Sequence, residues 1–335
     1  MCPKGRAIRY IFFVFRKKNR KTKKDATSIP HTKKIQFQTM ISICIPIYNF
    51  NVTRLVVALE KEIANKKLKT NIVLIDDCSN SEFKDKNFNI CSRHQYIQLE
   101  QNIGRAKIRN LFLEHTKSEY LIFLDCDSLI ISENFITNYA NAIKEQNAQV
   151  ICGGRIYDSK QPPRNKRLSW KYGIEIESKT YQTRLLEPNK SFMTNNFLIK
   201  REILEQIKFD ERLSKYGHED TLFGYYLKLA NIRIGHINNP ILNGDIEENK
   251  KFLKKTELGI VNLIAILDYI NYDQEFIKDV ALLSFYYRLK KTKLLFLVRF
   301  ILMILGPIIK YQLEKGYVNL SQFNLYKLSL LIRVC

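Results

Sequence analysis

Apolar runs alternate with amphipathic stretches between residues 41 and 124. The apolar runs are nearly continuous, as expected for strands that are buried on both faces of a sheet. The stretches between them carry apolar residues three and four positions apart, which is the helical period. We predict strands at Ile41–Ile47, Ile72–Ile75, Tyr96–Leu99 and Tyr120–Leu124, and helices over about 53–66 and from Gly104 onward. This order indicates an α/β fold with a mostly parallel sheet covered by helices on both faces.

Polar residues follow three of the predicted strands: Asn49, then Asp76 and Asp77, then Asp125 and Asp127. Open α/β sheets bind ligands beyond the carboxyl ends of their strands. An acidic edge accommodates a phosphorylated ligand when a cation lies between the charges, so we predict a nucleotide diphosphate bridged by Mg²⁺ or Mn²⁺. The alternatives are a solvated turn at Asp125 and Asp127 and a helix cap at Asp76 and Asp77.

Two further clusters carry charge at helix starts. Arg105 and Arg109 lie one helical turn apart after Gly104, so both could reach a diphosphate from one face. The alternative is a capping glycine followed by surface cations. Glu219 and Asp220 precede an apolar helix, where one carboxylate could act as a general base beside an acceptor hydroxyl. A capping pair at the helix N-terminus is a physically adequate alternative.

These stretches together carry a family resemblance. SICIPIYN (42–49), VLIDDCS (73–79), NIGRAKIRN (102–110) and LIFLDCDS (121–128) resemble, in this order, the nucleotide-sugar domain of family-two glycosyltransferases of the bacterial surface-polysaccharide type. GGRIY (153–157), SFMTNNFLIKRE (191–202) and GHEDTLF (217–223) resemble the acceptor half of the same family. The resemblance covers about residues 40–270 and implies a GT-A three-layer αβα sandwich followed by C-terminal helices.

The resemblance also implies roles for individual residues. It implies that Asp220 is the general base and that Glu219 holds the acceptor or shapes the site. It implies that Asp127, with Asp125, binds Mn²⁺ or Mg²⁺. The residues implied to bind the nucleotide-sugar are Pro46, Tyr48, Asp76, Asp77, Asn102, Gly104, Arg105, Arg109 and Asp125. Those implied to bind the acceptor are Trp170, Asn195, Asn196 and His218. Similar enzymes often have a further His ligand where this chain has Asn243, so Asp245 or water is expected to take its place.

The implied reaction is a metal-assisted, inverting transfer of a sugar from a nucleotide donor, with UDP expected, to a saccharide acceptor, with a lipid-linked glycan expected. Two alternatives share the fold: an inactive nucleotide-sugar-binding scaffold and a nucleotidyltransferase. The second should have a glycine-rich phosphate loop after the first strand, where this chain has Pro46-Ile47-Tyr48-Asn49.

The charge distribution argues against nucleic acid as a partner. The chain has a formal charge of +22, but residues 1–39 hold 12 basic residues and one acidic residue, and residues 288–335 hold nine and one. The body between them is nearly neutral and has an acidic strand-end edge, unlike a nucleic-acid-binding face. Basic ends on a neutral body favour contact with an anionic membrane surface.

Three regions follow from these patterns. Residues 1–39 are expected to form a basic arm, residues 40–250 a catalytic domain with a nucleotide-binding half (40–130) and an acceptor half (150–250), and residues 251–335 a helical segment at the membrane interface. The apolar stretch Leu294–Ile309 has 16 residues and contains Arg299 and Pro307, so it is expected to lie in the interface rather than span a bilayer. The protein is therefore expected on the cytoplasmic face of the cell membrane. The seven cysteines show no paired spacing and are expected to be free thiols.

Overall fold

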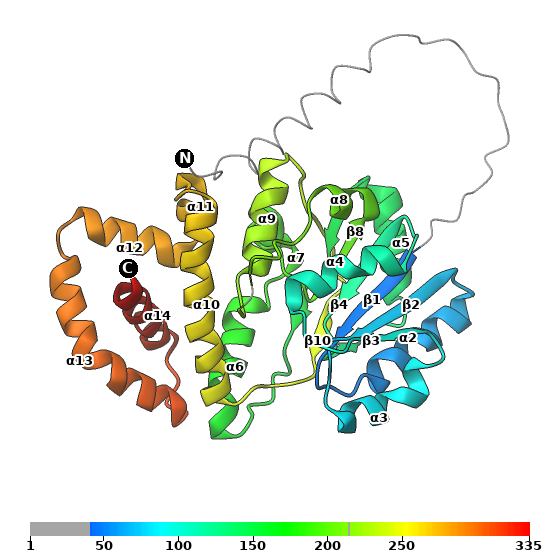
Figure 1. Ribbon diagram of the computed structural model, residues 1–335, viewed down its shortest axis with the longest axis horizontal. Helices are drawn as coiled ribbons and strands as arrows, with labels where there is room; N and C mark the ends of the chain where they lie inside the picture. The colour runs from blue at the N-terminus through cyan, green and yellow to red at the C-terminus, as the bar shows by residue number, and fades with distance from the viewer. Residues whose placement is uncertain (1–40, 214) are drawn as a thin grey trace, which may run out of the picture.

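A seven-stranded sheet forms the centre of the computed structural model, which describes residues 41–213 and 215–335 (Figure 1). The predicted basic arm at 1–39 lies outside these residues. Across the sheet the strands are β3 (Gln95–Gln98), β2 (Thr70–Asp76), β1 (Ile41–Ile47), β4 (Tyr120–Leu124), β8 (Asn196–Lys200), β6 (Val150–Cys152) and β9 (Gly235–His236). β8 is antiparallel to both its neighbours, and the other neighbouring pairs are parallel. The predicted α/β fold with a mostly parallel sheet is therefore confirmed.

Both faces of the central strands are buried, which explains their continuous apolar sequences. Cys44 and Phe123 pack into one core, whereas their neighbours Ile43, Ile45 and Ile122 pack into the other. The first core is covered by α4 (Arg105–His115), α8 (Arg201–Gln206) and α9 (Glu219–Leu229). The second is covered by α2 (Thr53–Lys66), α3 (Ser81–Cys91) and α5 (Phe135–Gln146). The result is the three-layer αβα sandwich that the sequence predicts.

A second, small sheet joins segments that are far apart in the sequence. β10 (Ile241–Asn243) pairs with β5 (Ser128–Ile130) in antiparallel orientation and with β7 (Arg155–Ile156) in parallel orientation. The N–H of Gly244 continues the pairing by donating to the Asp127 carbonyl at 2.8 Å. A Cβ at position 244 would lie 2.6 Å from that same oxygen, so only glycine fits there. The small sheet thereby brings residues 127, 155 and 243 together beyond the end of β4.

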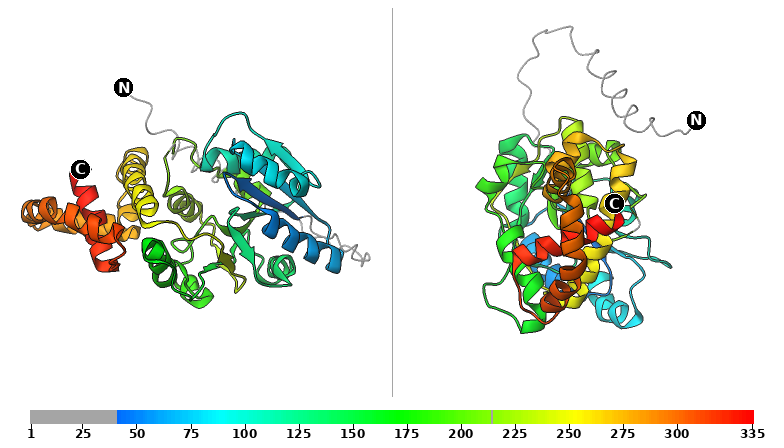
Figure 2. Two further views of the ribbon diagram at one scale, coloured as in Figure 1. Left: turned by 90° about the horizontal axis from the view of Figure 1, so that it is seen from below. Right: turned by 90° about the vertical axis from the view of Figure 1, so that its left-hand side faces the viewer.

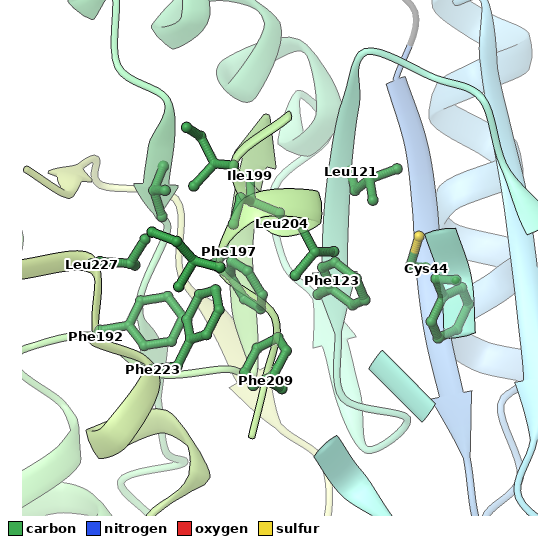
Figure 3. Packing of buried hydrophobic residues seen from close by; sticks show 14 of the residues in the cluster. Cys44, Leu121, Phe123, Phe192, Phe197, Ile199, Leu204, Phe209, Phe223 and Leu227 are labelled. Atoms are coloured by element: carbon green, nitrogen blue, oxygen red, sulfur yellow. The ribbon is translucent and has the colours of Figure 1, made fainter. Parts of the chain in front are cut away.

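Aromatic rings fill the core beside β8 (Figure 3). The Phe197 ring stacks on Phe123 with centroids 5.1 Å apart and meets the edge of Phe192 at 5.0 Å. Phe209 and Phe223 stack next to them at 4.1 Å. This cluster connects β4 and β8 to α9, and α9 begins with the predicted Glu219 and Asp220. The position of those two carboxylates therefore depends on aromatic packing.

The rest of the chain is mainly helical. Between the sheet strands lie α6 (Arg167–Tyr172) and α7 (Tyr181–Leu186), with a 3₁₀ turn at Arg164–Lys166 and a π turn at Gly173–Glu177. The C-terminal helices are α10 (Asn249–Tyr269), α11 (Gln274–Asp279), α12 (Ala281–Lys291), α13 (Leu295–Glu314) and α14 (Leu320–Val334). In Figures 1 and 2, α10 lies between the α/β body and the outer helices α12–α14. These helices share two apolar clusters, which also include Leu222 and Tyr225 of α9 and Leu168 of α6, so they pack as a layer against the sheet domain.

The helix α13 is longer than the sequence indicates. It continues through Pro307 to Glu314, which gives 20 residues instead of the predicted 16-residue apolar stretch. By length and composition it could cross a membrane, and only 17% of its most apolar window is buried. The exposed apolar side chains on it are Phe296, Leu297, Phe300, Ile301, Met303, Ile304, Leu305 and Ile308. The argument from insufficient length is therefore wrong, and the predicted position of this segment at a membrane interface stays a prediction.

Truncation of a ring in the aromatic cluster should be costly. Phe197→Ala removes a fully buried ring that contacts three other aromatic rings, so we expect the free energy of unfolding to fall by about 3–5 kcal/mol. Denaturant titration followed by circular dichroism measures this. Phe88→Ala, at a ring that is 57% exposed, is the matched control and should change stability by about 0.5 kcal/mol or less. Equal costs for the two variants would contradict the packing described above.

Candidate active site

The loops after β1 and β2 are fastened to each other. The N–H of Asn49 donates to the Ser79 Oγ at 2.9 Å, and the Asn49 Oδ1 accepts from the N–H of Asn80 at 2.8 Å. Asn49 adopts a positive φ of 48°, which turns the chain sharply at the end of the strand. Tyr48 is 53% exposed at this turn, whereas Pro46 is half-buried in β1. Tyr48 is thus accessible to a ligand at the carboxyl end of the sheet.

Asp76 and Asp77 hold loops rather than face solvent. Asp76 is fully buried, and its Oδ1 accepts from the N–H of Ser79 at 2.6 Å. The carboxylate of Asp77 accepts from the N–H groups of Ile103 at 2.7 Å and Gly104 at 3.1 Å. Burial raises the pKa of Asp77, although these two hydrogen bonds oppose the shift. The predicted contact of Asp76 with a base or ribose is therefore wrong, because no part of its side chain is accessible.

The predicted residues Asn102 and Gly104 shape the same loop. The Asn102 Nδ2 donates to the carbonyl of Asp77 at 3.0 Å, while the residue itself remains exposed. Gly104 has a φ of +84°, a conformation that side chains disfavour, and directly precedes α4. Together these contacts fix the start of α4 and with it the direction of Arg105.

Two arginines of α4 neutralise carboxylates from two other segments. The Arg105 Nε donates to Glu219, and its Nη2 lies 3.7 Å from the Asp125 Oδ2. The Arg109 Nη2 donates to the Asp125 Oδ1 at 2.8 Å. Burial would raise the pKa of Asp125, but Arg105 and Arg109 outweigh it and hold that pKa below its ordinary value. Asp125 is therefore a carboxylate at neutral pH.

Only one of the two arginines faces the solvent. The Arg105 side chain is 39% exposed, whereas that of Arg109 is 2% exposed. The prediction that both reach a diphosphate is therefore wrong for Arg109, since its guanidinium lies beneath Asp125 and holds it in place. Arg105 keeps an open side and also lies 5.2 Å over the ring of Tyr216.

Asp127 is paired with a cation that the sequence does not reveal. The Arg155 Nη2 donates to the Asp127 Oδ2 at 2.9 Å and also to the Asn243 Oδ1. The remaining Asn243 amide group donates to the Asp245 carbonyl at 2.5 Å. Burial raises the pKa of Asp127, and Arg155 opposes the rise. Asp127, Arg155 and Asn243 thus form one compact cluster at the start of the small sheet.

The donor set fits a resident divalent cation poorly. Within 41–213 and 215–335, no group of three or more His, Cys, Asp or Glu side chains could hold a metal ion. The two predicted ligands are each paired with arginine: Asp125 with Arg109, and Asp127 with Arg155. The Asn243 oxygen that could replace a histidine ligand also accepts from Arg155. The predicted Mn²⁺ or Mg²⁺ thus stays a prediction, and no step below is routed through it.

Among the four predicted acidic residues Asp125, Asp127, Glu219 and Asp220, Asp220 is the one that forms no ion pair with an arginine of the described residues. It lies in the first turn of α9, where its Oδ1 accepts from the N–H of Thr221 at 2.7 Å. Burial and the neighbouring charge of Glu219 raise the pKa of Asp220 to about 6. Glu219 has the opposite environment, since Arg105 holds it as a carboxylate. Two adjacent carboxylates with pKa values pushed apart are a common arrangement for proton transfer.

The loop before α9 is positioned from the C-terminal helices. The Asn262 Nδ2 of α10 donates to the carbonyls of Lys215 at 2.6 Å and Gly217 at 3.0 Å. His218 follows with a positive φ of 65°, and its Nδ1 lies 3.3 Å from the Thr221 Oγ1. Burial lowers the pKa of His218 to about 4, so the ring is neutral at physiological pH. The predicted acceptor contact of His218 stays a prediction.

The other predicted acceptor residues have different environments. Asn196 is buried and hydrogen-bonds to the Tyr139 hydroxyl at 2.7 Å and to the carbonyls of Gly154 and Asn239, so its predicted role at the acceptor is wrong. Asn195 is also buried, and its carbonyl accepts from the N–H of Asp125 at 3.1 Å. Trp170 is half-buried and donates from Nε1 to the Asp158 carbonyl at 2.7 Å. Trp170 keeps an accessible surface, and its contact with an acceptor stays a prediction.

Comparison with known proteins agrees with this architecture. A sequence model of glycosyl transferase family 2 matches residues 42–208. The chain is 24% identical over 181 residues to the Staphylococcus aureus poly(ribitol-phosphate) beta-N-acetylglucosaminyltransferase TarP; the match spans 48% of this chain and 49% of that protein. This chain therefore matches about half the length of that relative.

Solved structures with a similar arrangement include two glycosyltransferases. S. aureus TarS in complex with UDP-GlcNAc is 17% identical, with a TM-score of 0.47 over 86% of this chain and 90% of that one. The mannosyltransferase PcManGT of Pyrobaculum calidifontis, solved with GDP-Man and Mn²⁺, is 13% identical, with a TM-score of 0.48 over 77% and 71%. The family model covers β1 through α8, which includes Asp125, Asp127 and both α4 arginines. The chain belongs to glycosyltransferase family 2 and has its α/β GT-A fold.

Proposed function

We propose that this protein transfers a sugar from a UDP-sugar donor to a cell-envelope polymer with inversion at the anomeric carbon. Membership of glycosyltransferase family 2 supports the reaction class. The similarity to TarP makes N-acetylglucosamine the first sugar to test and a polyol-phosphate chain or lipid-linked glycan the first acceptors. The single observation that carries the mechanism is the unpaired Asp220 beside the arginine-bound Glu219.

Asp220 is suited to act as the general base. A base must be ionised when the acceptor binds and must still accept a proton readily, which favours a pKa near the working pH. The pKa of about 6 at Asp220 meets both conditions, whereas Glu219 is held ionised by Arg105. Glu219 then serves to fix Arg105 at the site entrance.

The proposed step is one displacement. The acceptor oxygen attacks the anomeric carbon while its proton passes to the Asp220 carboxylate. The bond from that carbon to the diphosphate oxygen breaks, and its electron pair leaves with the nucleoside diphosphate. Because one base and no second nucleophile takes part, the configuration inverts. A cation close to the diphosphate stabilises the negative charge that develops on it.

The other carboxylates and arginines position the reactants. Asp125 directly follows the carboxyl end of β4 and is fixed by Arg109. Its carboxylate can accept hydrogen bonds from sugar or ribose hydroxyls. Arg105, with its exposed side, can approach a phosphate. Tyr48 offers an exposed ring at the end of β1, where a nucleobase can stack.

Removal of the base should abolish transfer without weakening donor binding. For Asp220→Asn we expect sugar transfer to fall by about 100-fold to 10,000-fold, because the proton then has no acceptor. A nucleotide-release assay over a panel of UDP-, GDP- and dTDP-sugars measures transfer, and calorimetry measures UDP affinity. Asp85→Asn, at an exposed carboxylate on α3, is the matched control and should behave as the wild type. An Asp220→Asn variant with wild-type turnover would rule out Asp220 as the base.

The pH profile should report the same carboxyl group. Asp220 is protonated below its pKa of about 6 and ionised above it. The kcat/KM should therefore rise with pH through about 6 and level off above about 7, since only the ionised form accepts a proton. Initial rates measured with varied acceptor at saturating UDP-sugar across this range give kcat/KM for the acceptor and test the expectation. A flat profile would show that no group with this pKa controls the reaction.

We also propose that the C-terminal helices bind the cytoplasmic surface of the membrane, so that the site can reach a lipid-linked acceptor. Monomeric soluble proteins rarely expose so many apolar side chains on one helix as α13 does. Lys290, Lys291 and Lys293 are exposed at its beginning, and cations beside an apolar helix face favour anionic headgroups.

This surface can be tested with vesicles. The full chain should sediment with phosphatidylglycerol-containing vesicles, less so as salt rises, and only weakly with phosphatidylcholine vesicles. Replacing Lys290, Lys291 and Lys293 together by Gln should weaken binding by about 1 kcal/mol per lysine. The matched control replaces the exposed Lys66, Lys67 and Lys69, at the end of α2, and should bind as the wild type. Equal binding to both vesicle types would exclude the charge-based part of this proposal.

A further inference from the structure

The cluster around Arg155 is built to hold a positive charge at the strand-end edge. Arg155 opens β7, and its backbone pairs with Ile241 of β10. Asn243 lies at the end of β10 opposite Ser128, the residue that follows Asp127. Three separate segments of the chain therefore fix the Arg155 guanidinium, Asp127 and Asn243 relative to one another.

The guanidinium of Arg155 is enclosed on most sides. Its side chain is 12% exposed, and its carbon Cζ lies 5.2 Å over the Tyr157 ring. The Tyr157 hydroxyl is in turn held by Glu177 at 2.5 Å. The Nε of Arg155 is buried and has no hydrogen-bond partner within the described residues. This Nε is itself inaccessible, so a ligand can approach only the 12% of the side chain that stays exposed.

The same cluster uses the groups that a metal ion would need. The Asp127 Oδ2 and the Asn243 Oδ1 both accept from Arg155 Nη2. The neighbouring Asp125 Oδ1 accepts from Arg109. A divalent ion that bound the Asp127 Oδ2 would have to displace Arg155, which would leave a guanidinium without its carboxylate in a largely buried place. The packing of this chain therefore favours the arginine over an ion.

We propose that Arg155 supplies, as a fixed side-chain cation, the positive charge toward the departing nucleoside diphosphate that a divalent ion supplies elsewhere, so that transfer by this protein does not require Mn²⁺ or Mg²⁺. The inference rests on the proposed glycosyl transfer and concerns the same site. The bond changes are those of the displacement above. Arg155 takes no proton and forms no covalent bond; its charge stabilises the electron pair that leaves with the diphosphate oxygen. A permanently charged guanidinium suits this task because it is weakly hydrated and binds phosphate oxygens through paired N–H groups.

The test compares metal dependence in the wild type and in three variants. Nucleotide release from the donor found in the panel is measured with EDTA, with Mn²⁺ and with Mg²⁺. The wild type should keep its activity within about 2-fold in EDTA. Arg155→Gln should lose about 100-fold or more in EDTA, and Mn²⁺ should restore part of it because Asp127 and Asn243 are then free to bind the ion. Arg155→Lys keeps the positive charge, so its activity in EDTA should lie between those of the wild type and Arg155→Gln. The control is Arg164→Gln, at another arginine over a tyrosine ring, Tyr317, and it should match the wild type.

A binding measurement separates this inference from the proposed function. In EDTA, calorimetry should show that the wild type binds UDP and that Arg155→Gln binds it about 10-fold more weakly or worse. The inference is overturned if EDTA abolishes wild-type turnover and Mn²⁺ restores it, or if Arg155→Gln equals the wild type in EDTA. If no sugar donor is turned over with or without metal, the proposed function fails, and the UDP measurement alone then decides the role of Arg155. Thermal unfolding of each variant shows that it is folded.

Discussion

The candidate active site at the edge of this sheet depends on ion pairs between largely buried carboxylates and arginines. Parallel strands bring their carboxyl ends to one edge, and in this chain that edge carries Asp125 and Asp127, with Glu219 from α9 beside them. Unpaired carboxylates crowded into a partly buried place would repel one another and become protonated. Arg105, Arg109 and Arg155 each pair with one carboxylate and hold it in a fixed position. The arginines keep the pKa values of Glu219 and Asp125 below their ordinary values, and Arg155 opposes the rise in the pKa of Asp127 that burial causes. Asp220 is left out of this pairing.

This pairing separates the chemical roles of residues that look alike in the sequence. Glu219 and Asp220 are neighbours in the sequence, but Arg105 keeps Glu219 charged. The negative charge of Glu219, together with burial, raises the pKa of Asp220. Asp125 and Asp127 are separated by one residue, but their arginines come from α4 and β7. We therefore propose that the paired carboxylates position the reactants and that the unpaired Asp220 takes the proton.

Local patterns in the sequence predicted much of the fold. The strand at Tyr120–Leu124 and the helix at 53–66 match the structure because each has an unbroken apolar or helical period. The sequence also placed Asp125, Asp127, Glu219 and Asp220 correctly, because strand ends and helix starts are defined by nearby residues. The helix α13 is longer than the apolar stretch predicts because that stretch ends at Ile309, before Lys310, whereas packing against α10 and α14 continues the helix to Glu314.

Contacts between distant segments could not be predicted in this way. Arg155 lies within the motif GGRIY, yet nothing near it in the chain indicates Asp127 or Asn243 as its partners. β7 has only two residues, which is too short for a periodic pattern to indicate a strand. The burial of Asn196 against Tyr139 and Asn239 depends on the assembled sheet, so no local pattern indicates it. The burial of Asp76 and Arg109 has the same cause.

The most direct test of the proposed transfer is the configuration of its product. UDP-sugars such as UDP-GlcNAc carry the α configuration, so a single displacement with Asp220 as the base must give a β-linked product. Proton NMR of the product formed by the wild type reads this configuration from the coupling constant of the new anomeric proton. We expect a β-linked product from the wild type and no detectable product from the Asp220→Asn variant. An α-linked product would contradict the single displacement. Formation of the β-linked product by the Asp220→Asn variant at the wild-type rate would contradict the role of Asp220.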